Sequence, residues 1–475
     1  MKVLIVSTNR NRQPLAVLPY GACVAAEAAA GAGHEVRFLD LMFSADPARA
    51  LDRVLEAFRP DVAGFSVRNI DNNDLHTPVA FFEEASSLMR GAAKKNGLKI
   101  VLGGAAAGIM PEELLRSSGA HWAVLGDAPT VFPRLLAAIE RGTDPVSVPG
   151  VCSLQGGGFV RNPLVFGAWP GGGLFPDFRR WLDLKAYAGL MGAVPIKTKL
   201  GCPFRCVYCT YAASEGGEYR LCPPSAAAAK VRAMSEAGIG DIEFVDNVFN
   251  SPYEHAMELC RLLAAGGNRA RLHTMELNPA FTDRPLLDAM EAAGFAGIGI
   301  TAESASDGVL AALGKNYGAA EVRRSAEAVK LGRLPCMWIF ILGGPGETRE
   351  TVKRTLDFAR LELRPSDPVF FNIGVRIYPG TPLEAAARAE GTLKVPASEM
   401  LSPVFYVSPA VGREWLFETL KEAVDENMNF INPDSLALPF LPGLSRLAGL
   451  AGVRQPLWRH TRSLRRGLRS IGVNA

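Results

Sequence analysis

Three cysteines stand close together near the middle of the chain, in an arrangement that could bind metal. Cys202, Cys206 and Cys209 follow the spacing C-x3-C-x2-C, directly after an apolar, strand-like run at Val194–Lys199. Three thiolates this close in sequence can ligate three irons of a cuboidal iron–sulfur cluster and leave the fourth iron open. An open iron is a place where a ligand or substrate can bind and react.

Two other uses of these thiols are open from the residues alone. A structural zinc site needs a fourth protein ligand to complete a tetrahedron, and Cys222, beside Pro223 and Pro224, is the nearest candidate. A disulfide is a weaker alternative, because three clustered cysteines leave one thiol over.

The composition sets the frame for these residues. The length of 475 residues predicts two to four domains, and the 48% hydrophobic content is ample for buried cores. Eight cysteines in so long a chain do not suggest a disulfide framework, so a reducing compartment fits better. The first residues, Met1–Ser7, are too short an apolar run for a signal peptide, and no run approaches the ~18 apolar residues of a membrane span. We therefore expect a cytoplasmic protein.

The charge is unevenly distributed along the chain. The last segment, Ser435–Ala475, has seven arginines and no acidic residue, so the rest of the chain carries 44 basic against 48 acidic side chains. The body therefore lacks the basic surface of a nucleic-acid-binding protein. In the tail, Arg454–Arg469 surrounds Leu457 and Trp458, a pattern that suits peripheral contact with an anionic membrane or a helix docked on the acidic body.

Residues 1–145 alternate short apolar runs with helical patterns, which predicts a doubly wound parallel sheet. The expected strands are Lys2–Ser7, Glu35–Asp40, Asp61–Ser66, Lys99–Leu102 and His121–Leu125. The expected helices are Tyr20–Ala32, Pro47–Phe58, Thr77–Lys95, Pro111–Ser118 and Thr130–Arg141. Ligands of such sheets bind outside the carboxyl ends of the strands.

The glycine-rich stretch 146–185 reads as a wrapping linker. In residues 186–390, strand-then-helix units recur and, with the run before the cysteines, give six strands. This pattern predicts a partial (β/α)6 barrel with reactive groups at the carboxyl ends of its strands. The expected strands after the cysteines are Asp241–Val245, Arg271–Glu276, Gly297–Thr301, Cys336–Leu342 and Pro368–Ile377.

The remaining region, 391–475, reads as mainly helical with a basic tail. Trp415–Ile431 has the pattern of an amphipathic helix, and the apolar segments Leu436–Leu441 and Leu444–Leu450 follow it.

The cysteine loop, with Tyr208 directly before its last cysteine, resembles the signature of the radical S-adenosylmethionine (SAM) enzymes. The resemblance implies a 4Fe–4S cluster on Cys202, Cys206 and Cys209, whose open iron chelates the amino and carboxylate groups of SAM. An electron from the cluster then yields a 5′-deoxyadenosyl radical, which abstracts hydrogen from unactivated C–H bonds.

Two later segments resemble those that bind SAM in this family. Glu303 could accept hydrogen bonds from the ribose hydroxyls or amino group of SAM, or it could form a salt bridge at the barrel mouth. Gly343 and Gly344 would make room for adenine, although the same residues could form a tight turn before a helix. If the strand registers are right, four polar residues face the same mouth as substrate candidates: Asp246, Asn250, Asn372 and Arg376.

The loops of the first domain resemble the cobalamin-binding domain that precedes many radical SAM modules. Ser66, Gly103 and Gly104 match the positions that line the slot for the nucleotide tail, and Gly126 lies in the loop after the fifth strand. Glycine there allows the backbone to approach a bulky ligand. The alternative is a flavodoxin-like domain that binds a flavin or nothing.

The chain departs from that family at the lower ligand of cobalt. The motif D-x-H-x-x-G is missing after the first strand, where Ser7-Thr8-Asn9 stands, and His76 follows the wrong strand, so we interpret it as a helix-entry residue. The resemblance then implies base-off cobalamin with no histidine ligand. Arg68 is the candidate for the lower face, where a cation would disfavour bound water; a salt bridge or a phosphate contact is the alternative.

Together the resemblances imply a cobalamin-dependent radical SAM enzyme, most plainly a C-methyltransferase that uses methylcobalamin and a 5′-deoxyadenosyl radical. A small-molecule or lipid-like substrate and an electron donor such as flavodoxin or ferredoxin would go with it. One alternative keeps both cofactors but carries out a ring closure, contraction or rearrangement. A non-enzymatic corrinoid- or metal-sensing protein is another.

Overall fold

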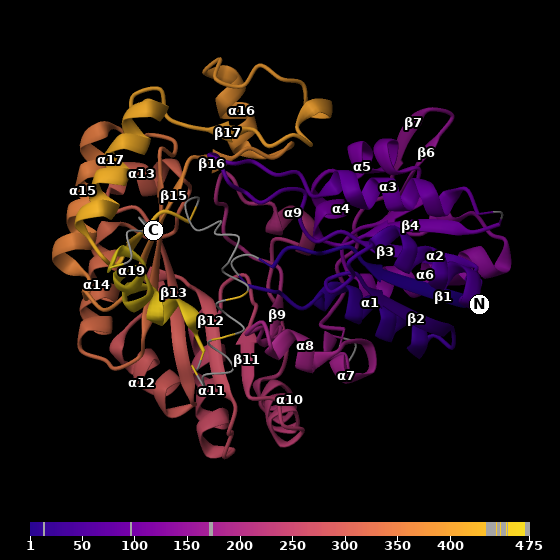
Figure 1. Ribbon diagram of the computed structural model, residues 1–475, viewed down its shortest axis with the longest axis horizontal. Helices are drawn as coiled ribbons and strands as arrows, with labels where there is room; N and C mark the ends of the chain where they lie inside the picture. The colour runs from indigo at the N-terminus through magenta and orange to yellow at the C-terminus, as the bar shows by residue number, and fades with distance from the viewer. Residues whose placement is uncertain are drawn as a thin grey trace.

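The structure is a computed structural model that describes residues 1–12, 15–95, 97–170, 174–433, 443, 447, 453 and 455–470. Figure 1 shows two sheets side by side, the first in indigo and purple and the second in red and orange. The first sheet has the strand order β2-β1-β3-β4-β5-β6-β7, and the second has the order β18-β15-β14-β13-β12-β11-β8. The predicted fold class, a doubly wound sheet followed by an open parallel barrel, is confirmed.

The first sheet is parallel through its first five strands. Its faces are both covered, because Val3 and Ile5 of β1 join one core while Leu4 and Val6 join another. The strands are β1 (Lys2–Ser7), β2 (Glu35–Asp40), β3 (Val62–Ser66), β4 (Lys99–Gly103) and β5 (Trp122–Val124). The helices are α1 (Tyr20–Gly31), α2 (Pro47–Phe58), α3 (Phe82–Ala93), α4 (Ala105–Ile109), α5 (Pro111–Ser118) and α6 (Ala128–Arg141).

The predicted helix Thr77–Lys95 is too long at its start, since α3 begins at Phe82. In the loop before α3, side chains accept hydrogen bonds from backbone amides that would donate to backbone carbonyls in a helix. Asn72 Oδ1 accepts from the amide of Val79 at 2.9 Å, and Asp74 Oδ1 accepts from the amide of Thr77 at 2.8 Å. His76 therefore lies in a loop, where its ring is 5.2 Å from that of Phe417.

The region predicted as a linker is largely structured. β6 (Val151–Gln155) and β7 (Gly158–Arg161) form an antiparallel hairpin that extends the first sheet. Gly156 and Gly157 have positive φ angles of 55° and 84°, so these glycines make the tight turn that the sequence reading took for a linker. Gly171–Gly173, also part of that prediction, lie outside the described residues.

Two short helices then lead to the second sheet, α7 (Phe178–Trp181) and α8 (Leu184–Ala188). Both pack on the first domain. Trp181 Nε1 donates to Glu27 at 2.8 Å, and the hydroxyl of Tyr187 donates to Asp40 at 2.7 Å.

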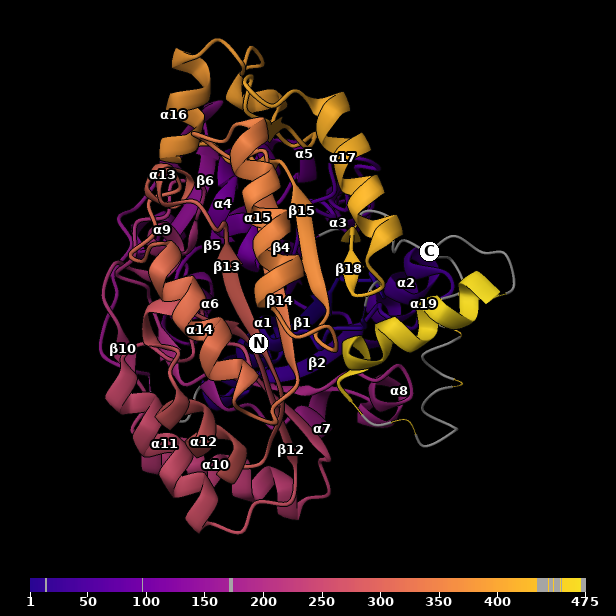
Figure 2. The ribbon, with the colours of Figure 1, turned by 90° about the vertical axis from the view of Figure 1, so that its left-hand side faces the viewer.

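The second sheet is parallel throughout. Its strands are β8 (Val194–Ile196), β11 (Asp241–Phe244), β12 (Arg271–Leu277), β13 (Phe295–Glu303), β14 (Cys336–Leu342), β15 (Val369–Ile373) and β18 (Phe430–Ile431). Helices cover its outer face, as Figure 2 shows. They are α10 (Pro224–Glu236), α11 (Tyr253–Ala265), α12 (Arg284–Ala292), α14 (Ala319–Lys330), α15 (Arg349–Glu362) and α17 (Arg413–Glu426).

Two predictions for this sheet are corrected. The strand expected at Pro368–Ile377 divides at Gly374, whose φ is 70°, and β16 (Val375–Arg376) turns away to pair with β17 (Phe405–Tyr406). The helix expected at Trp415–Ile431 ends with α17 at Glu426, and the residues after it form β18. The C-terminal region thus supplies a seventh strand to the sheet.

The tail ends in a 3-10 turn, Leu457–His460, and α19 (Thr461–Ser470). The predicted apolar segments Leu436–Leu441 and Leu444–Leu450 lie outside the described residues, except for Leu447. Within the part of the chain that the structure describes, no helix has the length and apolar character to cross a membrane.

Candidate functional site

The cysteine loop, Gly201–Cys209, runs from β9 (Lys199–Leu200) to α9 (Tyr211–Glu215). Gly201 has φ 80°, and a Cβ there would lie 2.0 Å from the carbonyl oxygen of Glu218, so glycine is required. The amide of Val207 donates to the carbonyl of Leu313 at 3.0 Å, which ties the loop to the segment after α13 (Asp307–Ala312).

The three thiols suit an iron–sulfur cluster. Cys202 is 7% exposed, while Cys206 and Cys209 are half-buried, so all three are shielded yet reachable. Among the described residues, no three His, Cys, Asp or Glu side chains lie close enough together to hold a single metal ion. Cys222 is fully buried in the hydrophobic core, where its thiol faces the carbonyl of Pro223 at 3.5 Å.

The strand before the loop is fixed by two acids. Asp246, 1% exposed, accepts from the amide and hydroxyl of Thr198 at 2.6 and 2.5 Å and from the amide of Lys199 at 3.1 Å. Glu215 accepts from Asn247 Nδ2 at 2.8 Å and pairs with Lys197. Asp246 was predicted as a substrate residue, but both of its carboxylate oxygens accept hydrogen bonds from the residues that precede the cysteine loop.

Tyr208, Glu303 and Lys315 form a buried cluster beside the cysteine loop. Glu303 Oε1 accepts from the hydroxyl of Tyr208 and from Nζ of Lys315, both at 2.8 Å, and Lys315 Nζ also lies 2.8 Å from the Tyr208 hydroxyl. Burial opposes the charge on Lys315, but the carboxylate of Glu303 prevails and raises the pKa of the lysine well above its usual value. The salt bridge considered from the sequence is therefore present, and Lys315 was missed there.

Gly343 and Gly344 form the start of a turn capped by Glu347. Their amides donate to Glu347 Oε2 at 2.5 and 3.2 Å. A Cβ on Gly343 would lie 2.9 Å from Leu416 of α17, so this glycine makes room for a helix of the same chain. Burial raises the pKa of Glu347 to about 7.

A cavity of about 860 Å³ opens at the carboxyl ends of β1, β2 and β3. This is the switch point of the sheet, where β2 and β3 lie on opposite sides of β1. Thr8, Arg12, Phe43, Val67 and Arg68 are among its lining residues. Its size and position fit a bulky ligand such as a corrin.

The other predicted cofactor residues of this domain lie along the same edge of the sheet. Ser66 is half-buried and is the register partner of Gly103, where an added Cβ would lie 4.0 Å from the carbonyl oxygen of Phe65. Gly104 has φ 91°, and a Cβ there would lie 2.3 Å from the carbonyl oxygen of Val67. Gly126 has φ 72°, and a Cβ there would lie 3.9 Å from the carbonyl oxygen of Ser214 of α9.

Four side chains lie near enough for their charges to interact in pairs: Arg68, Tyr211, Glu243 and Glu276. Tyr211 is 48% exposed, and Glu276 is also exposed to solvent. The surrounding protein, which disfavours the charged form, and then the charge of Glu303 raise the pKa of Glu276 to about 8. Within the described residues, neither Glu243 nor Glu276 has an ion-pair partner.

Two more substrate candidates are held by other parts of the fold. Asn250 is fully buried and accepts from the amide of Asn278 at 2.9 Å. Arg376 is 4% exposed and forms an ion pair with Asp71, with 2.9 Å between Nε and Oδ2. Asn372, the fourth substrate candidate, is half-buried in β15, between the buried Phe371 and Ile373.

The two domains meet at several points around this site. Asp127 at the start of α6 pairs with Arg220, whose second guanidinium nitrogen donates to it at 2.9 Å. Arg220 also donates to the carbonyl of Glu215 at 3.0 Å, and α4 contacts α9. The helix that follows the cysteines therefore packs on the edge of the first sheet.

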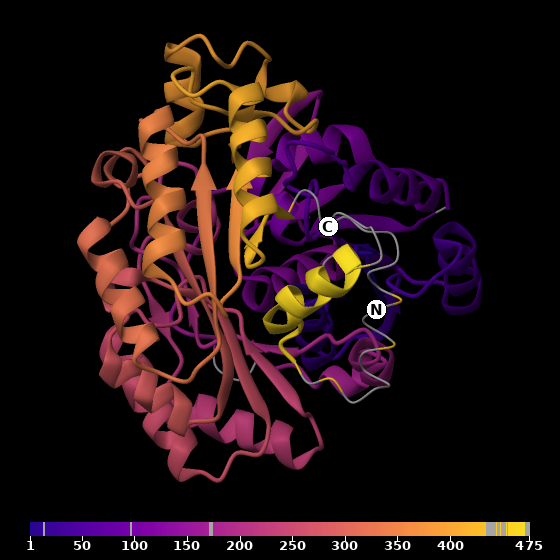
Figure 3. The same ribbon diagram turned by 60° about the vertical axis from the view of Figure 1, so that its left-hand side comes forward.

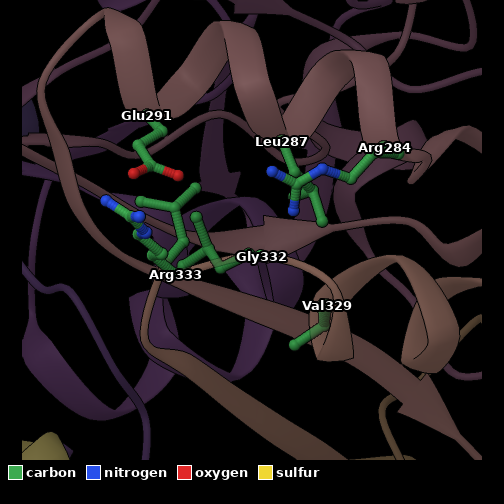
Figure 4. Close-up of a pocket in the computed structure, with 8 residues that line it drawn as sticks. Arg284, Leu287, Glu291, Val329, Gly332 and Arg333 are labelled. Carbon is green, nitrogen blue, oxygen red and sulfur yellow. The ribbon is translucent and has the colours of Figure 1, made fainter.

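A small recess elsewhere is unrelated to this site. Arg284, Leu287 and Glu291 of α12 face Gly332 and Arg333 across it, as Figure 4 shows. Side chains fill it and leave no room for a ligand.

Two domain families match the chain, and they match its two sheets. The B12 binding domain matches residues 13–136, and the radical SAM superfamily matches residues 196–359. The chain thus joins a B12-binding domain to a radical SAM domain. It belongs to the cobalamin-dependent radical SAM family.

Curated relatives include methyltransferases. The chain is 26% identical over 375 residues to an uncharacterized methyltransferase of Pyrococcus horikoshii, covering 76% of each chain. It is 24% identical to the tryptophan 2-C-methyltransferase of Streptomyces laurentii over 79% of this chain and 73% of that one. It is 29% identical to the hopanoid C-3 methylase of Methylococcus capsulatus over 54% and 47% of the two chains.

Solved structures share the fold. The radical SAM methyltransferase TsrM of Kitasatospora setae, with cobalamin and a 4Fe–4S cluster bound, matches with a TM-score of 0.84 at 23% identity, over 99% of this chain and 98% of that one. The cobalamin-dependent radical SAM enzyme OxsB matches with a TM-score of 0.72 at 14% identity, over 100% of this chain and 75% of that one.

Proposed function

We propose that the chain is a cobalamin-dependent radical SAM C-methyltransferase that methylates an unactivated carbon of a small-molecule or lipid-like substrate. One observation carries the proposal: α9, directly after the three cysteines, packs on the edge of the first sheet beside Gly126 and presents Tyr211 to Arg68 at the large cavity. In this proposal the two cofactor sites lie next to each other, on either side of α9. The methyltransferase relatives support the reaction class.

Each group of residues has a distinct part in this proposal. When bound, the cluster would supply the electron that cleaves SAM, and cobalamin would carry a methyl group. Cys202, Cys206 and Cys209 hold the cluster. Glu303, whose Oε1 is paired with Lys315, is proposed to accept from SAM through its other carboxylate oxygen, and the turn at Gly343 and Gly344 follows the neighbouring strand β14.

Arg68 is proposed to face the lower side of a base-off cobalamin, with no histidine ligand. Arg68 is exposed to solvent and lines the cavity, and its guanidinium group is a cation at neutral pH. A cation at this position disfavours a water molecule on cobalt. Ser66, Gly103 and Gly104 are proposed to leave room for the nucleotide tail.

The inner face of the second sheet is proposed to bind the substrate. Alternation along the strands turns Ile339, Ile341 and Phe370 to this face, because their neighbours pack under the outer helices. Glu243 and Glu276 lie on the neighbouring strands β11 and β12. The site therefore combines an apolar wall with two carboxyl groups that can accept N–H donors. A flavodoxin or ferredoxin is proposed as the electron donor, and a cytoplasmic location stays a prediction.

The test uses full-length protein loaded anaerobically with iron, sulfide and cobalamin. It is incubated with a strong reductant and SAM, and S-adenosylhomocysteine and 5′-deoxyadenosine are quantified. The proposal predicts both products, and their loss together in Cys206→Ala. Formation of 5′-deoxyadenosine alone would favour a ring closure, contraction or rearrangement, and absence of both from the loaded wild type would contradict the proposal.

A further inference from the structure

The C-terminal segment, residues 455–470, spans the two edges of the open second sheet. Near the β8 edge, the side-chain amide of Gln455 donates to the carbonyl of Met191. At the β18 edge, Arg465, 2% exposed, donates to the carbonyl of Phe430 and, at 3.0 Å, to that of Val424. Figures 2 and 3 show the yellow α19 running below α17 and β18.

Between these two anchors the segment rests on the middle of the sheet. A Cβ added to Gly297 of β13 would lie 2.7 Å from Pro456 Cγ and 2.8 Å from Cζ2 of Trp458. A side chain at position 297 would therefore displace the indole ring. The Leu457–His460 turn also contacts β14. Trp458 thus covers the amino-terminal half of the inner face, at the level of His273 in the register of β12 with β13.

The proposed cluster and SAM site lies at the other end of the inner face, at the carboxyl ends of the strands. Glu303, at the carboxyl end of β13, contacts Tyr208 of the cysteine loop. From Gly297 to Glu303 is six residues of one strand, a span of roughly 20 Å at 3.3 Å per residue. Between them the inner face is incompletely packed, because Thr301, Ile339 and Phe370 are half-buried. A substrate that reaches the cluster can therefore extend along the sheet until it meets Trp458.

We propose that Trp458 is a specificity-determining residue that sets how far a flat, apolar substrate extends along the inner face. The inference rests on the proposed function, because it assumes that this face binds the substrate. It assigns a role to a segment beyond residues 196–359, which the radical SAM superfamily matches. The half-buried indole ring offers an aromatic surface against which the far end of such a substrate packs.

The experiment compares a short and a long probe, indole and 2-phenylindole. Full-length protein loaded with cluster and cobalamin is titrated with each by calorimetry, without SAM or reductant. Trp458→Ala, which removes the ring, is expected to raise the affinity for 2-phenylindole relative to indole at least tenfold, and Trp458→Phe by a smaller factor. Arg459→Ala alters an exposed side chain of the same turn and is expected to keep the wild-type ratio.

The ratio of the affinity for 2-phenylindole to that for indole separates a specificity role of Trp458 from a merely structural one. Equal losses for both probes in Trp458→Ala, an unchanged ratio, or no binding of either probe by any variant would overturn the inference. If Trp458→Ala does not fold, the ratio in Trp458→Phe decides. Methyl transfer without a change in the ratio would overturn this inference alone, whereas the expected ratio without methyl transfer would overturn the proposed function alone.

Discussion

At the residue scale, Glu303 carries the strongest sign of a functional position. Its φ of 61° lies in the left-handed region, which side chains other than glycine rarely adopt. Such strain persists where surrounding contacts fix the residue, and here Lys315 and Tyr208 hold the carboxylate. The strain interrupts the pairing of β13 with β14 and turns Glu303 toward the cysteine loop.

Lys315→Met is expected to lower SAM cleavage. Without the ammonium group, the buried carboxylate of Glu303 loses its ion pair, and the Tyr208 hydroxyl loses a partner. We expect the rate of 5′-deoxyadenosine formation to fall about tenfold or more, equivalent to about 1.4 kcal/mol. Lys330→Met, which removes an exposed lysine, is the control and should keep the wild-type rate. A normal rate in Lys315→Met would show that the ion pair has no part in SAM cleavage.

Glu276→Gln is expected to change the pH dependence of stability. The folded protein holds a proton on Glu276 up to a pKa of about 8, while the unfolded chain releases it near pH 4. Between these values the folded state binds more protons, so this group makes wild-type stability fall as pH rises. Urea unfolding should show Glu276→Gln gaining stability over wild type from pH 5 to pH 8. An equal difference at both pH values would contradict this, and Glu254→Gln, on the exposed face of α11, is the control.

At the element scale, two arginines of the tail helix α19 form hydrogen bonds with backbone carbonyls at the end of α17. Arg465 donates to the carbonyls of Val424, Asn427 and Phe430, and Arg469 donates to that of Asp425 at 3.0 Å. Carbonyls at the end of a helix lack intrahelical partners, so these contacts cap α17. The docked helix considered from the sequence is the arrangement that the structure has, and its contacts with the end of α17 engage Arg465 and Arg469.

Arg465→Ala is expected to destabilise the C-terminal region by about 2–4 kcal/mol, because one buried and two partly buried carbonyls lose a charged donor. Urea denaturation followed by tryptophan fluorescence measures this. Arg466→Ala removes the exposed neighbouring charge and should change the unfolding free energy by less than about 0.5 kcal/mol. Equal effects of the two substitutions would mean that α19 is not docked through Arg465.

Much of this arrangement follows from local pattern. The bounds of β1 and β14 match the expected ones, because continuous apolar runs between turn residues mark buried parallel strands. The bounds of β2 also match, through the alternation of apolar and charged residues in an edge strand. The split at Gly374 and the strand at Phe430 were missed, since a two-residue strand has no periodicity of its own. Asp246, Asn250 and Arg376 were taken for open groups because a sequence does not show which partner a polar side chain finds across the fold.

At the scale of the whole molecule, a buried ion pair joins the domains. Arg376 and Asp71 are 2% and 0% exposed in their side chains, and Arg376 also donates to the carbonyls of Ile377 at 2.6 Å and Met400 at 2.7 Å. Asp71 lies in the loop that begins with Arg68. The pair therefore fixes the cavity loop of the first domain against the second.

Arg376→Met is expected to cost about 3–5 kcal/mol, because it leaves the Asp71 carboxylate buried without its partner. The double variant with Asp71→Asn should cost less than the sum of the two single changes, as expected for groups in direct contact. Urea unfolding measures stability, and retention of cobalamin on gel filtration measures the cavity loop. Additive single effects would mean that the two side chains do not act as a pair.

The central claim is that one molecule holds an iron–sulfur cluster and cobalamin in a shared region. Metal and corrin analysis of anaerobically loaded protein, with electron paramagnetic resonance of the reduced cluster, tests it most directly. We predict about four irons and one cobalamin per chain, and a cluster spectrum that changes when SAM is added, because one iron is open. One zinc per chain, no cobalamin and no response to SAM would contradict the account.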